Sequence, residues 1–433
     1  MESPLPPLLN FLLPLIIAAV LHHSTAATSY PKEALPTKSG YLKVNSTGSA
    51  IFYTFYEAQN SHNTSISQTP ILIWLQGGPG CSSMIANLFE LGPWLVNQDL
   101  SLEPNPGSWN RIFGLLFLDN PIGTGFSISA SFQEIPKNQH DVAKHLFTAI
   151  KKFVALDLSF KTRPIYITGE SYAECFLPSE NRVNLAGVAI GNGLTDPESQ
   201  VSTHAVNAYN LGLINEKQKT LLEKIQLEAV GFVKSGKWSE ATDARNRVLN
   251  TLTNMTGLAT LYDFRRLIPY EDDLVAKFLN NVEIKKALGV NESLVFEICG
   301  DVVGKALHDD VMKSVKYMVE FLVKNTKVLL YQGQCDLRDG VVSTLAWVKK
   351  MKWEEIDEYL EAERKIWRVD GKIAGYVQKW KSLSHVVVLN AGHLVPTDQS
   401  LNSQAMIEDW VLEKGLFAAE TIEEMHGTFR GFI

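Results

Sequence analysis

Residues 164–178, PIYITGESYAECFLP, contain the feature around which the chain is organised. Residues 165–168 are β-branched or aromatic, which is typical of a buried strand. Ser171 follows almost at once between Gly169 and Ala173, so the serine stands on a sharp turn that leaves a strand. Residues that flank such a turn must be small because the backbone passes close to itself. The stretch predicts a nucleophilic serine, although an ordinary strand-to-helix turn can have a similar sequence.

Other short apolar runs alternate with helical segments, and polar residues follow several of them. Residues 71–75 (ILIWL) lead into QGGPGCSS, residues 328–331 (VLLY) lead to Asp336, and residues 386–389 (VVVL) lead to His393. Strands that alternate with helices predict an α/β sheet, with its chemistry beyond the carboxyl ends of the strands. The other runs expected to be strands are residues 39–45, 50–57, 115–118 and 185–190.

The order Ser171, Asp336, His393 is the order of catalytic residues in the α/β-hydrolase fold. A serine hydroxyl is a weak nucleophile until a base removes its proton, and the imidazolium that forms needs a carboxylate behind it. We therefore expect an α/β-hydrolase with a mostly parallel central sheet. The alternatives that the sequence leaves open are His385 or His308 as the base and Asp339 as the acid.

The glycine-rich loop at residues 76–83 follows a predicted buried strand directly. Three glycines and a proline in such a place leave backbone amides exposed, and exposed amides can stabilise a developing oxyanion. Residues 84–91 have the character of a helix that ends before Gly92-Pro93. A simple tight turn is the alternative interpretation of the loop.

The pattern of predicted secondary structure changes between residues 196 and 300. Helical patterns and runs of Lys and Glu dominate there, and buried-strand signals are absent. We interpret this part as a helical insertion over the site, although further crossover helices would look similar. The expected organisation is a signal peptide at 1–27, a first core part at 28–195, the insertion or cap at 196–300 and a second core part at 301–433.

The N-terminus has the pattern of a secretory leader. Residues 8–20 (LLNFLLPLIIAAV) are apolar and are followed by small residues, as before a cleavage site. A membrane anchor is the alternative, but the run is short and interrupted by proline. Four sequons fit passage through the secretory pathway and make these asparagines candidate glycosylation sites: Asn45, Asn63, Asn254 and Asn291.

Composition is that of an ordinary globular protein, with 45% hydrophobic and 20% charged residues in 433. The net charge of −7 gives no reason to expect nucleic acid or an anionic membrane as partner. The chain has four cysteines and no CxxC motif, so we expect no metal and no redox site. In an oxidising compartment some of the cysteines should pair.

Five ordered blocks resemble those of the serine carboxypeptidases, and most of all the plant serine carboxypeptidase-like proteins. The similarity runs from about residue 40 to residue 410. The blocks are residues 74–83 (WLQGGPGCSS), 90–93 (ELGP), 116–121 (LFLDNP) with 125–127 (GFS), 169–173 (GESYA) and 390–396 (NAGHLVP).

The resemblance implies a role for each matching residue. Ser171 would be the nucleophile, His393 its base and Asp336 the acid that orients the base, while the amides of Gly78 and Tyr172 would form the oxyanion hole. The resemblance also implies that the terminal carboxylate of a peptide substrate is bound by Gln76, Gly77, Glu90 and Glu170. Two adjacent carboxyls should raise the pKa of at least one of them, which predicts activity at acid pH.

The resemblance also implies a disulfide between Cys81 and Cys299. Cys175 and Cys335 are then left over, and they either pair or stay reduced. Sequence spacing alone does not decide between these two states.

The chain departs from the family pattern in three places. The block around Ser171 normally ends Ala-Gly, whereas here Ala173 is followed by Glu174 and Cys175. Gln76 stands where the family normally has Asn. Glutamine keeps the side-chain amide but places it one methylene group farther from the backbone. Between Pro178 and Leu185 only six residues precede the next predicted strand. A parallel crossover needs roughly a dozen residues, usually helical. The stretch between Gly169 and Asn184 offers barely that many, and the turn and Pro178 use part of it. The helix behind the serine must therefore be shortened, and a weak or inactive hydrolase is expected.

The expected function is that of a secreted or vacuolar serine-type carboxypeptidase that acts at acid pH on peptides with a free C-terminal carboxylate. The alternatives are an acyltransferase, which would pass the acyl group to an alcohol, and a catalytically silent binding protein. No cofactor, no nucleic acid and no membrane association after leader cleavage are expected, and the oligomeric state is left open.

Overall fold

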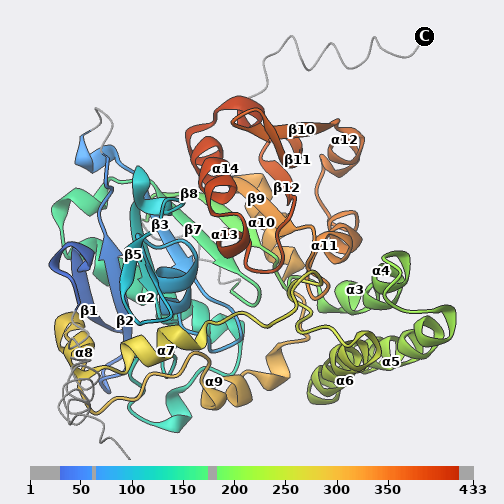
Figure 1. Cartoon of the computed structure of the whole chain (residues 1–433), viewed down its shortest axis with the longest axis horizontal. Coiled ribbons are helices and arrows are strands. Elements are labelled where there is room, and N and C mark those ends of the chain that lie inside the picture. Colours follow the sequence, from blue (N-terminus) through green and yellow to red (C-terminus); the bar gives the residue numbers. More distant parts are fainter. Residues whose placement is uncertain (1–29, 61–64, 174–182, 419–433) are drawn as a thin grey trace, which may run out of the picture.

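The computed structural model describes residues 30–60, 65–173 and 183–418, which are built around one ten-stranded sheet (Figure 1). The strand order is β1-β2-β6-β3-β7-β8-β9-β12-β11-β10. Neighbours from β6 to β12 are parallel, and the strands outside them are antiparallel. The expected α/β fold with a mostly parallel sheet is confirmed. The strands are β1 (Lys38–Lys43), β2 (Ala50–Tyr56), β3 (Ile71–Leu75), β6 (Gly114–Leu118), β7 (Ile165–Glu170), β8 (Leu185–Gly191), β9 (Lys327–Gly333), β10 (Arg364–Val369), β11 (Lys372–Trp380) and β12 (Leu383–Val388).

The described helices outside residues 196–300 lie between these strands and after the last one. The α-helices are α2 (Gln139–Ala155), α9 (Asp301–Ala306), α10 (Lys316–Asn325), α11 (Val341–Val348), α12 (Ile356–Glu361), α13 (Val395–Asp398) and α14 (Ser400–Leu412). The short 3-10 turns are η1 (Lys32–Ala34), η2 (Ile66–Gln68), η4 (Trp109–Arg111), η5 (Phe132–Glu134), η6 (Leu158–Lys161), η7 (His308–Asp310) and η8 (Gly415–Phe417).

Helices cover both faces of the sheet, which is why its inner strands are buried and mostly apolar. Alternate residues of a strand point to opposite faces. The odd-numbered residues of β3 pack with Leu146 and Ile150 of α2. Leu72 and Trp74 of the same strand pack with Met406 of α14. The carboxyl ends of β3, β7, β9 and β12 therefore meet at one edge of a sheet that is buried on both sides.

The helix expected at residues 84–91 is present, and its main part, η3 (Ala86–Glu90), is π-helical. Two parts of the fold differ from the sequence expectation. A small second sheet pairs β4 (Trp94–Val96) with β5 (Leu102–Pro104), and the hairpin of β10 and β11 extends the main sheet. These strands escaped prediction because several of their residues are exposed, so they lack a continuous apolar run.

Residues 197–288 contain helices and no strand, and the helices form two separate groups. The first group has its own apolar core, with Leu222, Ala244 and Val248 among its members. In the second group, Val275 and Phe278 pack instead near β2, on the far side of the molecule (Figure 1). The division into core and cap domains stays a prediction. The helices are α3 (Pro197–Val201), α4 (His204–Asn210), α5 (Glu216–Lys234), α6 (Trp238–Thr256), then α7 (Asp273–Leu279) and α8 (Val282–Leu288).

Candidate active site

Ser171 occupies a strained turn immediately after β7. Its φ angle is 62°, in the left-handed region that residues with a side chain rarely adopt. The Ser171 amide donates to the carbonyl of Gly191 at 3.0 Å, and the Leu194 amide donates to the Ser171 carbonyl at 3.1 Å. Contacts with the end of β8 therefore hold the serine backbone in this conformation.

Glycines beside the serine leave room for the turn. A Cβ atom on Gly169 would lie 2.8 Å from the Cβ of Ala173. A Cβ on Gly77 would lie 2.6 Å from the Tyr172 amide nitrogen and 2.8 Å from the Ser171 Cβ. The loop after β3 therefore lies directly against the serine turn, and the small residues are needed for steric reasons.

His393 and Asp336 meet from the loops that follow β12 and β9. The Nδ1 atom of His393 lies 2.7 Å from Oδ2 of Asp336, and both residues are 2% exposed. Because a carboxylate accepts, Nδ1 carries the proton and Nε2 is left to accept one. Nε2 is buried and has no hydrogen-bond partner among the described residues. It is available to remove a proton from a serine hydroxyl.

The Asp336 carboxylate is held by more than the histidine. Its Oδ2 atom accepts from the side-chain amide of Asn192 at 2.7 Å, and its Oδ1 atom accepts from the Arg338 amide at 2.7 Å. Asn192 also accepts from the Gly333 amide at 3.2 Å. The sequence interpretation missed Asn192, whose only signal was its place just after a predicted strand.

The alternative acid, Asp339, is engaged elsewhere. Its carboxylate lies 3.3 Å from the Arg245 guanidinium of α6 and 3.4 Å from the Gln200 side-chain amide of α3. No hydrogen bond joins Asp339 to His393 in the described part of the chain. Asp339 instead joins α3 and α6 to the loop that carries Asp336.

Neither alternative base contacts Asp336. His385 lies inside β12, where its Nε2 atom is 2.5 Å from Oε1 of Gln332, and burial lowers the pKa of His385 to about 4. His308 lies in η7 and is 3.0 Å from the Asp243 carboxylate. The geometry therefore places His393, and not these residues, beside a buried acid.

A segment between α6 and α7 contacts the loops of both His393 and Asp336. The His393 amide donates to the Tyr262 carbonyl at 2.6 Å, and the two rings lie 4.5 Å apart. The Leu337 amide donates to the Leu261 carbonyl at 3.0 Å. This segment thus helps to hold His393, a role that sequence reasoning did not assign to Tyr262.

The two residues expected to form an oxyanion hole lie on adjoining loops. Gly78 has a φ angle of 115°, and its amide makes no hydrogen bond to another described residue. The hydroxyl of Tyr172 donates to Oδ2 of Asp310 at 2.7 Å. Asp310 is buried and also accepts from the Gln139 amide and from Nζ of Lys313. Asp310 was not singled out in the sequence because no motif surrounds it.

Glu90 and Glu170 form a buried carboxyl pair with Gln76. Each glutamate is 1% exposed. Nε2 of Gln76 donates to Oε1 of Glu170 at 3.1 Å, while Oε1 of Gln76 accepts from the Trp74 indole at 2.7 Å. Both carboxyl oxygens of Glu90 and Oε2 of Glu170 are buried without a hydrogen bond of normal geometry to a described residue.

This environment favours protonated carboxyls. Burial raises the pKa of Glu90 to about 8, and the charge of Asp398 adds to the rise while contacts with Gln76 and Glu170 oppose it. Burial also raises the pKa of Glu170 well above its usual range, and the charge of Glu90 raises it further. At least one proton therefore stays on the pair near neutral pH.

Cys81 and Cys299 form a disulfide, as the resemblance implied. It joins the loop after β3 to the segment before α9. Cys335 is buried and forms no disulfide with another described residue, and burial raises the pKa of its thiol to about 11. Cys175 lies outside the described residues, so its pairing stays undecided.

The remaining expectations concern the secretory pathway and metals. Asn45 is half-buried, Asn254 and Asn291 are exposed, and Asn63, the leader at 1–27 and residues 174–182 lie outside the described residues. No described helix has the length and apolarity that crossing a membrane requires. The described residues contain no cluster of three or more His, Cys, Asp or Glu side chains suited to a metal ion.

Known proteins that are similar to this chain include serine carboxypeptidases and serine carboxypeptidase-like proteins. Residues 29–413 match the family model described as serine carboxypeptidase. Serine carboxypeptidase-like 50 of Arabidopsis thaliana is 54% identical over 96% of this chain and 96% of its own length. Probable serine carboxypeptidase CPVL of Homo sapiens is 33% identical over 89% of this chain and 85% of its own length.

A solved structure resembles the fold over a similar span. Kex1(delta)p, a prohormone-processing carboxypeptidase from Saccharomyces cerevisiae, matches with a TM-score of 0.77 and 25% sequence identity. The match covers 88% of this chain and 92% of that chain. The similarity thus extends along nearly the whole chain and is not confined to single motifs.

Proposed function

The chain belongs to the serine carboxypeptidase family of hydrolases, and from this premise we propose that it removes C-terminal residues from peptides through an acyl-enzyme. Ser171 attacks the scissile carbonyl, and Nε2 of His393 takes the hydroxyl proton. Asp336 holds the imidazole and stabilises its positive charge. The observation that carries this proposal is the buried His393–Asp336 hydrogen bond of 2.7 Å beside the strained turn at Ser171.

The oxyanion that forms on the substrate carbonyl is stabilised by the amides of Gly78 and Tyr172. His393 then donates its proton to the leaving amine, which departs as the released C-terminal amino acid. A water molecule enters, His393 removes its proton, and the hydroxide attacks the acyl-enzyme. Collapse of this second intermediate frees the shortened peptide and returns the proton to Ser171.

Recognition of a free carboxylate is assigned to Glu90, Glu170 and Gln76, with Gly77 beside them. A protonated carboxyl can donate a hydrogen bond to the substrate carboxylate, whereas an ionised one would repel it. The buried, unpartnered oxygens of the pair and the raised pKa of both glutamates support this role. The proton on the pair also accounts for the proposed activity at acid pH.

The proposed location is the secretory pathway, with an extracellular or vacuolar destination. The leader-like residues 8–20 and the sequons support it. A disulfide that spans 218 residues also fits an oxidising compartment. Among the relatives, one is described as a venom serine carboxypeptidase of Apis mellifera.

The test compares three kinds of substrate with the purified, secreted protein. Blocked dipeptides with a free carboxylate should be cleaved, the matching dipeptide amides should react poorly, and Ser171→Ala should abolish cleavage. Efficient transfer from sugar-ester acyl donors to an alcohol, without dipeptide cleavage, would indicate an acyltransferase. No reaction with either, combined with normal folding, would indicate a catalytically silent member of the family.

A further inference from the structure

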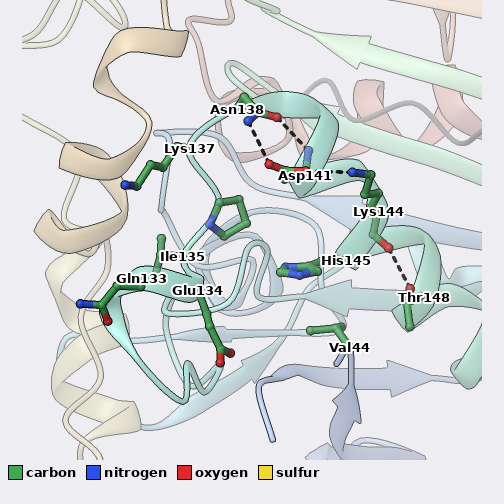
Figure 2. A pocket seen from close by; sticks show the side chains of 11 residues that line it. Val44, Gln133, Glu134, Ile135, Lys137, Asn138, Asp141, Lys144, His145 and Thr148 are labelled. Carbon is green, nitrogen blue, oxygen red and sulfur yellow. Dashed lines mark hydrogen bonds and ion pairs between the residues drawn. The ribbon is translucent and has the colours of Figure 1, made fainter. Parts of the chain in front are cut away.

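A cavity of about 560 Å³ lies away from the catalytic residues, between η5, the start of α2 and the turn after β1 (Figure 2). Its wall has an apolar part, made by Val44 and Ile135, and a polar part, made by Glu134, Lys144 and His145. Such a mixture suits a ligand that has both hydroxyl groups and an apolar ring face. The proposed hydrolase mechanism makes no use of this cavity.

The sequon at Asn45 adjoins the cavity, because Asn45 follows Val44 and is hydrogen-bonded to Glu134, and both of these residues line the cavity. Nδ2 of Asn45 donates to Oε2 of Glu134 at 2.8 Å. Its Oδ1 atom accepts from the amides of Gly48 and Ser49 at 3.2 and 3.0 Å. The Ser49 hydroxyl donates to the same Glu134 oxygen in a short hydrogen bond. The turn therefore wraps around one carboxylate that also lines the cavity.

We infer that Asn45 carries an N-linked glycan whose first sugar rests in this cavity. The inference rests on the proposed passage through the secretory pathway. In the transfer, a bond forms between C1 of an N-acetylglucosamine and Nδ2 of Asn45. The bond from C1 to the oxygen of a lipid diphosphate breaks, and one Nδ2 proton is released. The second Nδ2 hydrogen remains, so the bond to Glu134 can persist.

The cavity offers unused polar groups to a sugar. Nδ1 of His145 is buried and has no hydrogen-bond partner among the described residues. Lys137 extends from the rim and makes no ion pair within the described part of the chain, whereas Lys144 lies 3.1 Å from Asp141. Sugar hydroxyls can both donate and accept, and the acetamido methyl can cover Val44 and Ile135.

Two other sequons provide internal controls. Asn254 is exposed on the outer surface of α6. Asn291 is exposed in the loop after α8, where its Oδ1 atom accepts from Ser293. A glycan on either residue would extend into solvent, without a Glu134-like anchor among the described contacts.

The test uses the full-length protein secreted from a eukaryotic host, with site-by-site mass spectrometry. The folded protein is treated over time with an N-glycan amidase. Release at Asn45 should be on the order of tenfold slower than at Asn254 and Asn291, because one or two hydrogen bonds to the sugar must first break. After denaturation the three sites should be released at similar rates.

Two variants test the cavity itself. Glu134→Ala removes the anchor, and Thr148→Trp fills the cavity without touching the sequon. Both variants should stay glycosylated at Asn45, and in both the amidase should release this glycan as fast as those at the other two sites. Thr148→Trp keeps the result interpretable if Glu134→Ala fails to fold. Equal release at the three sites in the unmodified protein, or an unmodified Asn45 beside glycosylated Asn254 and Asn291, would overturn the inference. Absence of glycans at every site would overturn it together with the secretory proposal, while peptidase activity is measured separately.

Discussion

At the scale of single residues, the main feature is the buried carboxyl pair of Glu90 and Glu170. Two acids that are each 1% exposed share one site, and neither has a cationic partner among its described hydrogen bonds. An unpaired buried charge is costly, so the proton stays and the pair becomes a hydrogen-bond donor. The same carboxyls would repel a substrate carboxylate once they ionise.

This pair predicts the pH dependence of activity. Cleavage of peptides, measured as kcat/KM, should fall as pH rises past about 8, where Glu90 loses its proton. It should also fall at low pH because protonated His393 cannot act as a base, which makes the profile bell-shaped. For a peptide amide, which lacks the carboxylate, kcat/KM should no longer fall at alkaline pH. A flat profile from acid to alkaline pH would contradict the assignment of the pair.

The same pair predicts how stability varies with pH. The folded protein keeps a proton on Glu90 up to a pKa of about 8, whereas the unfolded chain releases it near 4.5. The contribution of Glu90 to stability is therefore present at low pH and is lost as pH rises between these values. Each pKa unit corresponds to about 1.4 kcal/mol. Denaturant titrations of Glu90→Gln should show a shallower decline over this range, and an unchanged slope would refute the prediction.

Asp310 predicts an effect that acts through Tyr172. Asp310→Ala removes the acceptor of the Tyr172 hydroxyl and should lower kcat on the order of tenfold or more, because a misplaced oxyanion amide is less effective. Asp310→Asn keeps an oxygen that can accept, so it should recover most of the rate. Lys313→Ala is the matched control, since it removes the ion pair to Asp310 and a contact with the Trp238 ring but leaves the acceptor of the Tyr172 hydroxyl in place. Similar losses in all three variants would indicate a general effect on folding.

At the scale of elements, the connection between β7 and β8 is close to the shortest that a parallel crossover allows. Only residues 171–184 separate the two parallel strands, and nine of these residues, 174–182, lie outside the described part of the chain. The contacts of Ser171 with Gly191 and Leu194 support the serine from the side of β8. A longer helix would add apolar packing and aligned backbone amides behind the nucleophile.

The short connection predicts weak reactivity of the serine. A fluorophosphonate probe, which reacts only with an activated serine, should label the natural chain poorly. A version with a family-length helix inserted between Pro178 and Val183 should be labelled more strongly, on the order of a hundredfold if the serine otherwise lies about 1 Å out of place. Ser171→Ala in each version is the control. Equal labelling of both versions would show that the natural length suffices.

At the scale of the whole molecule, one covalent bond joins distant parts of the chain. The Cys81–Cys299 disulfide spans 218 residues and ties the loop that carries Gly78 to the segment after the helical insertion. Backbone hydrogen bonds flank it, from Ser82 to Ile298 at 2.8 Å and from Gly300 to Gly80 at 2.9 Å. The bond therefore braces the candidate oxyanion loop as well as the fold.

Removal of this disulfide should cost on the order of 2–5 kcal/mol of unfolding free energy, because it closes a very long loop. The double variant Cys81→Ala with Cys299→Ala should show this loss in denaturant titrations. The matched control is Cys335→Ala, which removes a thiol that forms no disulfide with another described residue and should change stability far less. Non-reducing peptide mapping that joined Cys81 to Cys335, or found Cys81 free, would contradict the assignment.

The sequence by itself determined the fold class and which residues are brought to the catalytic edge. Continuous apolar runs predicted the buried strands because a strand covered on both faces has few positions that face water. Ser171, Asp336 and His393 could be singled out because each follows such a run within a few residues. The ordered blocks then indicated the family. These signals are local, so a single chain suffices to recognise them.

Only the tertiary structure decided which residues support the triad and which alternatives fail. Asn192 and Tyr262 come from segments far from Asp336 and His393, which they contact, and Asp310 lies far in sequence from its partner Tyr172. No spacing in the sequence links these pairs. Asp339 is excluded because the insertion supplies Arg245 as its partner. The raised pKa of Glu90 likewise depends on burial and on charges brought near by folding. Contacts of this kind depend on distance in space, which sequence separation does not encode.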